Sequence, residues 1–306
     1  MSKQRIDDAT GVETVGHEWD GIEELNNPLP RWWLWSFYAC IVFAIGYSVV
    51  YPAIPLLNTA TAGTFGWSSR GELDKEMKAE AARTAGLRAE LAKASIEQIA
   101  ADSKLRRAAI DGGRAAFKVN CIQCHGNGAA GSAGYPNLND DDWLWGGDAA
   151  TIHQTLVNGI RQPGDDATRM SQMPAFGRDG ILTAAQVQDV VSHVRVIAGQ
   201  EKLSASALRG APIYTANCAV CHGAVGEGSR AVGAPRLNDA IWLYGGDRKS
   251  LTQTITNARY GVMPSWGTRL DPVTVKMLAT YVHSLGGGEE APASLPDAAP
   301  TAATAN

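Results

Sequence analysis

The sequence predicts an all-α protein with one N-terminal transmembrane helix, a helical linker and two tandem helical domains of the same type. Three observations support this: an uncharged run of twenty residues, a charged segment without proline, and a series of motifs that occurs twice. We expect these boundaries: an N-terminal segment over 1–31, the transmembrane helix over 32–55, the linker over 56–103, the two domains over 104–200 and 201–286, and a disordered tail over 287–306.

The composition excludes two classes of protein. Charged residues make up 19% of the 306 residues and the formal net charge is −4, so no basic excess indicates a nucleic-acid partner. Hydrophobic residues make up 45%, which is enough for packed cores and excludes a wholly disordered chain.

The uncharged run covers residues 32–51 and reads WWLWSFYACIVFAIGYSVVY. As a helix it would span about 30 Å, the thickness of the hydrocarbon core of a bilayer. A cleaved signal peptide is the alternative, and Ala-Thr-Ala at 60–62 resembles a cleavage site. Because the run is longer than the apolar part of a typical signal peptide, we expect a retained helix in contact with membrane lipid. Lys3, Arg5 and Arg31 precede the run, so the positive-inside rule places the N-terminus in the cytoplasm.

The segments on either side of the two domains have contrasting compositions. Residues 70–103 are rich in Ala, Glu, Lys and Arg, a pattern typical of a solvated helix with i,i+4 ion pairs. A partly disordered tether is the alternative. After Leu285 the chain reads GGGEEAPASLPDAAPTAATAN, which cannot form a packed core, so we expect a disordered tail.

Between these segments the sequence repeats itself. Four motifs of the first copy return in the same order in the second, at 121–125 and 218–222, 136–140 and 235–239, 143–148 and 242–247, and 173–177 and 263–267. The order indicates a duplicated domain, with an inserted loop at 162–168 of the first copy. Each copy is expected to be mostly helical. The expected N-caps are Asp148, Asp247, Asp271 and Thr183, the last in a capping box with Gln186.

The first motif of each copy is Cys-X-X-Cys-His. Covalent haem c requires two thiols to form thioethers with the vinyl groups and a neighbouring histidine to ligate iron. Four of the five cysteines, Cys121, Cys124, Cys218 and Cys221, meet that requirement, whereas Cys40 lies alone in the apolar run. A zinc site or a redox dithiol is the alternative, but neither requires the histidine at that position in both copies. The sequence therefore predicts two covalently bound haem c groups in two small cytochrome c domains.

The iron ligands follow from the same motifs. His125 and His222 are the expected proximal ligands, and Met173 and Met263, each followed by proline, are the expected distal ligands. Met170 is the alternative in the first copy. Two similar domains in contact could also exchange their methionine loops, so own-domain and exchanged pairing both remain open. With both axial positions filled, the irons have no open site, which favours electron transfer over catalysis.

The remaining histidines have structural interpretations. His193 occupies the position of Tyr281 in the second copy, so it is expected to pack near Phe117 on the first helix of its own copy. His283 is expected on a helix surface. His153, His193 and His283 remain alternative axial ligands, because histidine can replace methionine in cytochromes.

One segment before the apolar run resembles a known family. Residues 16–33 read GHEWDGIEELNNPLPRWW, and together with the single span, both Cys-X-X-Cys-His motifs, the DWLWGG stretch at 142–147 and both Met-Pro motifs they resemble the diheme c-type subunit (CcoP/FixP, subunit III) of cbb3-type cytochrome c oxidases. The resemblance implies a subunit of a bacterial inner membrane with its haem domains in the periplasm. It also implies that the chain contains no catalytic centre of its own.

The resemblance further implies a path for electrons. The subunit would accept electrons from a donor cytochrome c and pass them to the monohaem c subunit, from which they reach the haem–copper subunit that reduces oxygen and pumps protons. Asp140, Asp141 and Asp142 could receive a basic donor, or they could form a solvated turn. The alternative functions are a stand-alone membrane-bound diheme carrier and, in another class, a diheme peroxidase or haem gas sensor, which would require an open iron.

Overall fold

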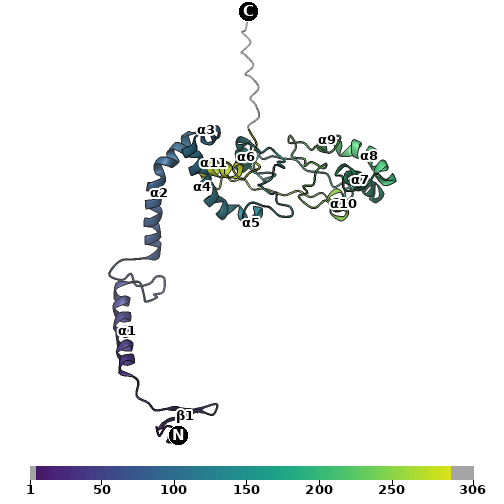
Figure 1. Ribbon diagram of the computed structural model, residues 1–306. Helices are drawn as coiled ribbons and strands as arrows, with labels where there is room; N and C mark the ends of the chain where they lie inside the picture. Colours follow the sequence, from purple (N-terminus) through teal and green to yellow (C-terminus); the bar gives the residue numbers. More distant parts are fainter. Residues whose placement is uncertain (1–4, 291–306) are drawn as a thin grey trace, which may run out of the picture. The chain divides into compact units, whose positions relative to one another are not determined.

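The computed structural model describes residues 5–290. The chain forms two compact units, 1–83 and 84–306, which are described separately (Figure 1). Most of the expected tail, residues 291–306, lies outside the described residues.

The first unit begins with a β-hairpin that the sequence analysis did not predict. Strands β1 (Thr14–Trp19) and β2 (Ile22–Leu25) are antiparallel, and Trp19 pairs with Ile22 across a two-residue turn. Both turn residues have positive φ, 50° at Asp20 and 85° at Gly21. That geometry matches the right-handed twist of a hairpin, and Asp-Gly is a residue pair that favours it.

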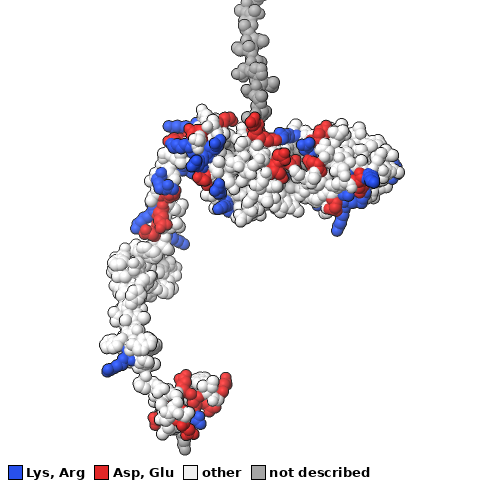
Figure 2. Space-filling model, in the orientation of Figure 1, with Lys and Arg blue, Asp and Glu red and all other residues white. Residues whose placement is uncertain are grey.

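Helix α1 (Arg31–Val50) confirms an apolar helix at the expected place, although it ends at Val50 and not at the expected boundary of residue 55. None of its residues is buried within the protein, and Figure 2 shows its surface without charged side chains beyond its start. An apolar surface of this extent is unstable in water, so a bilayer is the environment that fits it. The chain then folds back onto the helix end, where Tyr51 contacts Phe65 and Trp67 edge-on and Thr64 N donates to Val49 O at 3.0 Å.

The linker is helical but it is interrupted. Helix α2 (Ser69–Lys93) has exposed ion pairs such as Lys78–Asp74 at 2.7 Å, as the charge pattern predicts. It is followed by α3 (Ile96–Ala101) and by α4 (Ser103–Asn120), which begins at the N-cap Asp102. The last turns of α2 contribute the buried Leu91 to a small core, so this end of the linker is part of the second unit.

The second unit contains two helical cores, and each combines helices of both repeats (Figure 1). In the first core, α4 and α5 (Ile122–His125) lie with α6 (Ala149–Asn158), and α11 (Pro272–His283) packs on α4 and α6. In the second core, α8 (Ala205–Asn217) and α9 (Ala219–His222) lie with α10 (Arg248–Asn257), and α7 (Ala184–Ile197) packs on α8 and α10. The last helix of each repeat therefore completes the core of the other repeat.

Aromatic contacts confirm this exchange. The Tyr281 ring of α11 lies 5.4 Å from the Phe117 ring of α4, and the His193 ring of α7 lies 5.2 Å from the Tyr214 ring of α8. The prediction that His193 packs near Phe117 was therefore wrong. His193 does lie on the last helix of its repeat, as predicted. The sequence pattern identifies the apolar face of that helix, but it does not tell which of two similar helices the face contacts.

The exchanged helices approach their partners closely at two glycines. A Cβ atom at Gly113 of α4 would lie 2.2 Å from the carbonyl oxygen of Met277, and one at Gly210 of α8 would lie 2.0 Å from that of Asp189. Any side chain at either position would push the helices apart. The same small residue is thus required at the same place in both cores.

The two chain segments that lead to the exchanged helices cross as a short antiparallel bridge. Ile160 N donates to Met263 O at 2.9 Å, and Met263 N donates to Ile160 O at 3.0 Å. Arg161 ties the segments together, because its Nε donates to Gly261 O and its Nη1 to Ser171 O. The crossing is therefore held by backbone and side-chain hydrogen bonds.

The segment after α11 is ordered further than expected. Trp143 Nε1 donates to Gly287 O at 2.6 Å, and Glu289 exchanges hydrogen bonds with Gly147 and pairs with Arg230. The prediction of a disordered tail from residue 287 was thus wrong for 287–289. His283 is also not a plain surface residue, since its Nε2 lies 2.8 Å from Glu289 O.

Candidate functional site

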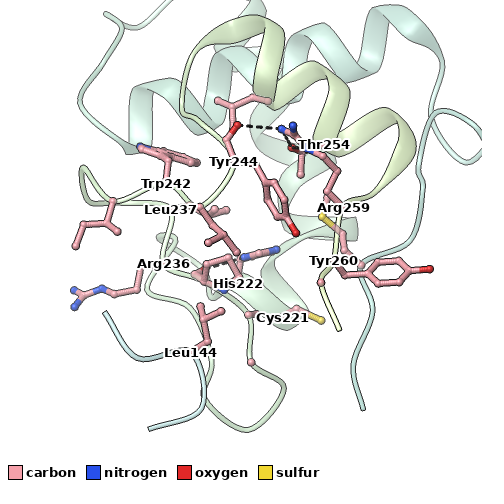
Figure 3. A pocket seen from close by; sticks show the side chains of 18 of the residues that line it. Leu144, Cys221, His222, Arg236, Leu237, Trp242, Tyr244, Thr254, Arg259 and Tyr260 are labelled. Atoms are coloured by element: carbon pink, nitrogen blue, oxygen red, sulfur yellow. Dashed lines mark hydrogen bonds between the residues drawn. The ribbon is translucent and has the colours of Figure 1, made fainter. Parts of the chain in front are cut away.

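Each Cys-X-X-Cys-His motif stands at the end of a long helix. Helix α8 ends at Asn217, and the next turn, α9, carries the motif, with His222 N donating to Cys218 O at 2.9 Å. Cys218, Cys221 and His222 line one cavity of about 610 Å³, which lies within the range of about 300–1,000 Å³ typical of ligand and cofactor sites (Figure 3). Helices α4 and α5 place Cys121, Cys124 and His125 in the same way in the first core.

A backbone carbonyl fixes the imidazole of each motif. Nδ1 of His222 lies 3.0 Å from Pro235 O, and Nδ1 of His125 lies 3.1 Å from Pro136 O. A carbonyl oxygen only accepts, so Nδ1 carries the proton and Nε2 keeps a free lone pair. Burial lowers the pKa of both imidazoles, which keeps them in the neutral form that can ligate a metal.

The methionines lie in the opposite cores from their own Cys-X-X-Cys-His motifs. Met173 lines the cavity of His222 and packs against the core of Cys218. Met263 packs against the core that contains Cys121. Met170, the alternative in the first copy, is 63% exposed. The structure therefore brings each Met-Pro motif to the exchanged position.

The donor set in each core fits haem c. In the core of Cys218, two thiols, an imidazole and a thioether line a cavity with an apolar lining, to which Leu237, Leu251 and Ile255 contribute. In the other core the same four kinds of group belong to Cys121, Cys124, His125 and Met263. Within residues 5–290 there is no group of three or more His, Cys, Asp and Glu side chains placed to hold a metal, so the zinc alternative gains no support. His153, His193 and His283 do not line the cavity.

Two arginines that the sequence analysis did not single out occupy equivalent positions of the repeats, and Arg259 lines the cavity. The guanidinium of Arg259 lies 4.7 Å from the Tyr244 ring and that of Arg169 lies 5.2 Å from the Trp145 ring. Each arginine stands four residues before the methionine of a Met-Pro motif. This repeated spacing between arginine and methionine is the sequence feature that could have identified both arginines.

The acidic stretch is only partly solvated. Of its three residues only Asp141 is exposed, and Asp142 lies half-buried on the lining of the cavity. Burial, together with the nearby charges of Asp239, Asp140 and Asp141, raises the pKa of Asp142 to about 6, against the lowering effect of Arg236. The stretch therefore lies where the two repeats meet.

Comparison with known proteins agrees with this architecture. The family model described as the N-terminal domain of cytochrome oxidase-cbb3, FixP, matches residues 11–58, and that described as cytochrome c oxidase, cbb3-type, subunit III, matches 108–194 and 205–282. The chain is 54% identical to the CcoP subunit of Cereibacter sphaeroides over 90% of this chain and 95% of that protein. It is 49% identical to the FixP subunit of Sinorhizobium medicae over 94% and 98%.

The chain belongs to the CcoP/FixP family of cbb3-type cytochrome c oxidase subunits.

Membership confirms the family resemblance and the predicted all-α architecture. A CcoP/FixP chain is a cytochrome c subunit of the oxidase complex, and the family implies haem c as its cofactor. The Cys-X-X-Cys-His motif and methionine of each core are consistent with an electron-transfer role, and helix α1 is consistent with an inner-membrane anchor. The hairpin β1–β2 falls within the matched residues 11–58, so it is part of the segment that the family shares.

Proposed function

We propose that this chain is the membrane-anchored diheme electron-transfer subunit of its oxidase. In this role it accepts electrons from a donor cytochrome c and passes them to the monohaem c subunit, and from there they reach the haem–copper subunit. The observation that carries the proposal is the pair of equivalent cores, each with two cysteines, a carbonyl-bound histidine and a methionine. Bound haem supplies a reversible one-electron change at iron.

The structure supports specific roles for eight residues. Cys121 and Cys124 would hold one haem by thioether bonds, and Cys218 and Cys221 would hold the other. His125 and Met263 would ligate the iron of the first haem, and His222 and Met173 that of the second. A thioether ligand favours the ferrous state and so raises the potential, whereas the Nδ1–carbonyl bond strengthens the histidine as a donor.

Exchanged pairing is favoured over own-domain pairing by the crossing segments. Own-domain pairing would require Met173 to leave the core of Cys218, and Met263 to break its two hydrogen bonds with Ile160. Since each core places an imidazole and a thioether that would both ligate the iron, neither core would leave the open site that a peroxidase or gas sensor needs.

Topology follows from the charges beside the span. Basic residues precede α1, so the N-terminus lies in the cytoplasm and both haem cores lie in the periplasm. The hairpin then faces the cytoplasmic side, where a partner subunit rather than a periplasmic donor can reach it. That placement favours an oxidase subunit over a free carrier.

The experiment is purification of the tagged chain from gently solubilised native membranes, followed by a pyridine haemochrome spectrum. The proposal expects haem b together with haem c, and oxygen uptake with a reduced cytochrome donor. Two haems c per chain without haem b or oxygen uptake, after chemical cross-linking of the membranes before solubilisation, would instead establish the stand-alone carrier.

A further inference from the structure

The chain remains uncharged well beyond the end of the apolar helix. Helix α1 ends at Val50, yet residues 32–69 contain no charged side chain and Arg70 is the first. Figure 2 shows no charged side chain on the visible surface between α1 and α2. Surfaces that face water usually carry many charged residues, so this stretch fits a less polar environment. We call residues 52–68 the uncharged loop.

The second half of the uncharged loop is fixed to the C-terminal end of α1. Thr64 N donates to Val49 O at 3.0 Å, and Phe65 N donates to Val50 O at 3.1 Å. Gly63 has a φ of 69°, and a Cβ atom there would lie 2.4 Å from Val50 O. The close approach therefore requires glycine, and the loop lies at the level where the apolar helix ends.

Aromatic rings gather at the same level. The Tyr51 ring stacks on that of Tyr47, with 4.8 Å between the centroids. The rings of Phe65 and Trp67 contact Tyr51 edge-on at 5.5 Å and 5.8 Å. Tyrosine and tryptophan are enriched where a membrane meets water. The cluster therefore marks the membrane boundary at the loop, not only at the helix.

The first half of the uncharged loop is an ordered turn with an apolar tip. Leu56 N donates to Thr59 O at 2.7 Å, and Thr61 N donates to Ile54 O at 2.9 Å. The Thr61 hydroxyl also accepts from Ile54 N at 3.1 Å. At the tip, Leu56 is exposed and Leu57 is fully exposed. A fixed turn that presents two leucines to water is unfavourable, so an apolar environment is expected to cover them.

Only one layer of a bilayer fits both properties of the loop. An irregular loop has backbone groups that need water or lipid headgroups, which excludes the centre of the hydrocarbon core. The leucine tip, in contrast, excludes bulk water. The boundary between headgroups and acyl chains satisfies both, and the absence of charge avoids repulsion from anionic lipids.

We propose that the uncharged loop is a second membrane anchor, whose leucine tip inserts into the headgroup–acyl boundary beside the C-terminal end of α1. The occupant of this apolar surface is lipid, because the surface continues that of the helix. Helix α2 begins at Ser69, two residues after Trp67, so the anchor also holds the start of the linker at the membrane. This inference rests on the membrane anchoring in the proposed function.

The test uses the full-length tagged chain in native membranes, with the photoreactive residue p-benzoylphenylalanine at one position at a time. Leu57→p-benzoylphenylalanine probes the tip, and the same change at Leu208 of α8 is the matched control, since that leucine is exposed on the second unit. Phe43 and Ile45 are the membrane controls, because they are exposed on different faces of α1. After illumination, mass spectrometry of the digested chain identifies what each position is joined to.

The proposal expects phospholipid adducts at position 57, as at 43 or 45, and none at 208. A position 57 that is joined to a peptide of another subunit would overturn the inference and make the loop a protein contact. An unjoined position 57 in a sample with lipid adducts on α1 would overturn it too, since the tip would then face water. If the Leu57 variant does not accumulate, the same change at Leu56 decides.

Failure of the proposed function has a separate signature. If neither position 43 nor position 45 is joined to lipid, α1 does not contact the bilayer, and the membrane-anchored role itself is rejected. Lipid adducts on α1 without any at the loop would leave that role standing and reject only the second anchor.

Discussion

At the scale of single residues, the axial methionines give the sharpest test of the exchange. In a chain that carries only the second haem, after Cys121→Ala and Cys124→Ala, we expect Met173→His to abolish the thioether–iron charge-transfer band and lower the potential. Met263→His in the same chain should leave the band in place. Optical spectra and redox titration measure both effects, and the reverse result would show own-domain ligation.

Asp142 leads to a prediction about pH. Its pKa is about 6 in the folded protein, above the usual value of 3.8, so the folded state binds the proton more tightly than the unfolded state. Stability must then fall as the pH rises from about 4 through 6. Asp142→Asn should therefore melt at a higher temperature than the wild type at pH 8, and this gain should shrink towards pH 4.5.

The control for this prediction is Asp166→Asn on the exposed inserted loop. It should change the melting temperature little at either pH, because an exposed charge is screened by solvent. If Asp142→Asn raises the melting temperature equally at pH 4.5 and pH 8, the gain comes from relief of packing strain and not from removal of the charge.

The residues of the site differ in how far the sequence predicts them. Cysteine and histidine lie within one short motif, so local spacing is enough to find them. The methionine pairing depends on contacts between distant segments, which spacing does not encode. Arg169 and Arg259 were missed because an arginine is most often a solvated surface residue, although the repeated spacing to methionine was readable.

At the scale of helices and strands, the close approaches at glycine set the packing of α11 on α4. We expect Gly113→Ala to destabilise the protein by about 1–3 kcal/mol, because its Cβ would overlap a backbone carbonyl that cannot move alone. Gly86→Ala in α2 is the matched control, since nothing lies within 4 Å of its Cβ. It should be neutral or stabilising by up to about 1 kcal/mol.

Thermal unfolding followed by circular dichroism measures both variants. A Gly113→Ala protein as stable as the Gly86→Ala protein would contradict the tight α4–α11 contact.

Most elements were predictable from local signals. The expected N-caps Asp148, Asp247 and Asp271 and the capping box at Thr183 are all confirmed, because capping depends on residues within one turn. The hairpin also had a local signal, Asp-Gly at 20–21, which was overlooked beside the strong helical pattern. The breaks in the linker follow Ser95 and Asp102, which are N-caps inside a segment of uniform composition.

At the scale of the whole molecule, the exchange of α7 and α11 could not be read from the sequence. Both helices have the same kind of apolar face, and both partner helices offer an aromatic residue and a glycine at matching positions. The choice between two nearly equal partners depends on the crossing at Ile160 and Met263, where segments about one hundred residues apart meet. The predicted domains 104–200 and 201–286 match the two repeats of the sequence, but each packed core contains helices of both repeats.

The exchange predicts energetic coupling between residues of different repeats. Leu278 of the second repeat is fully buried in the core that contains Phe117 of the first, whereas Tyr214 of its own repeat belongs to the other core. Leu278→Ala should cost about 2–5 kcal/mol, as large-to-small changes in cores do. The double variant Leu278→Ala/Phe117→Leu should lose an amount of unfolding free energy that differs from the sum of the two single losses by at least about 0.5 kcal/mol, because the two side chains share one core.

The matched cycle pairs Leu278→Ala with Tyr214→Phe, for which the two costs should add within about 0.5 kcal/mol. Denaturant unfolding of the three single variants, the two double variants and the wild type measures both cycles on the same protein. If α11 instead packed in its own repeat, Leu278→Ala would couple to Tyr214→Phe, and its cost would add to that of Phe117→Leu. Because each core needs a helix from the other repeat, the two haem sites then form and unfold together, which keeps their ligands in place as one unit.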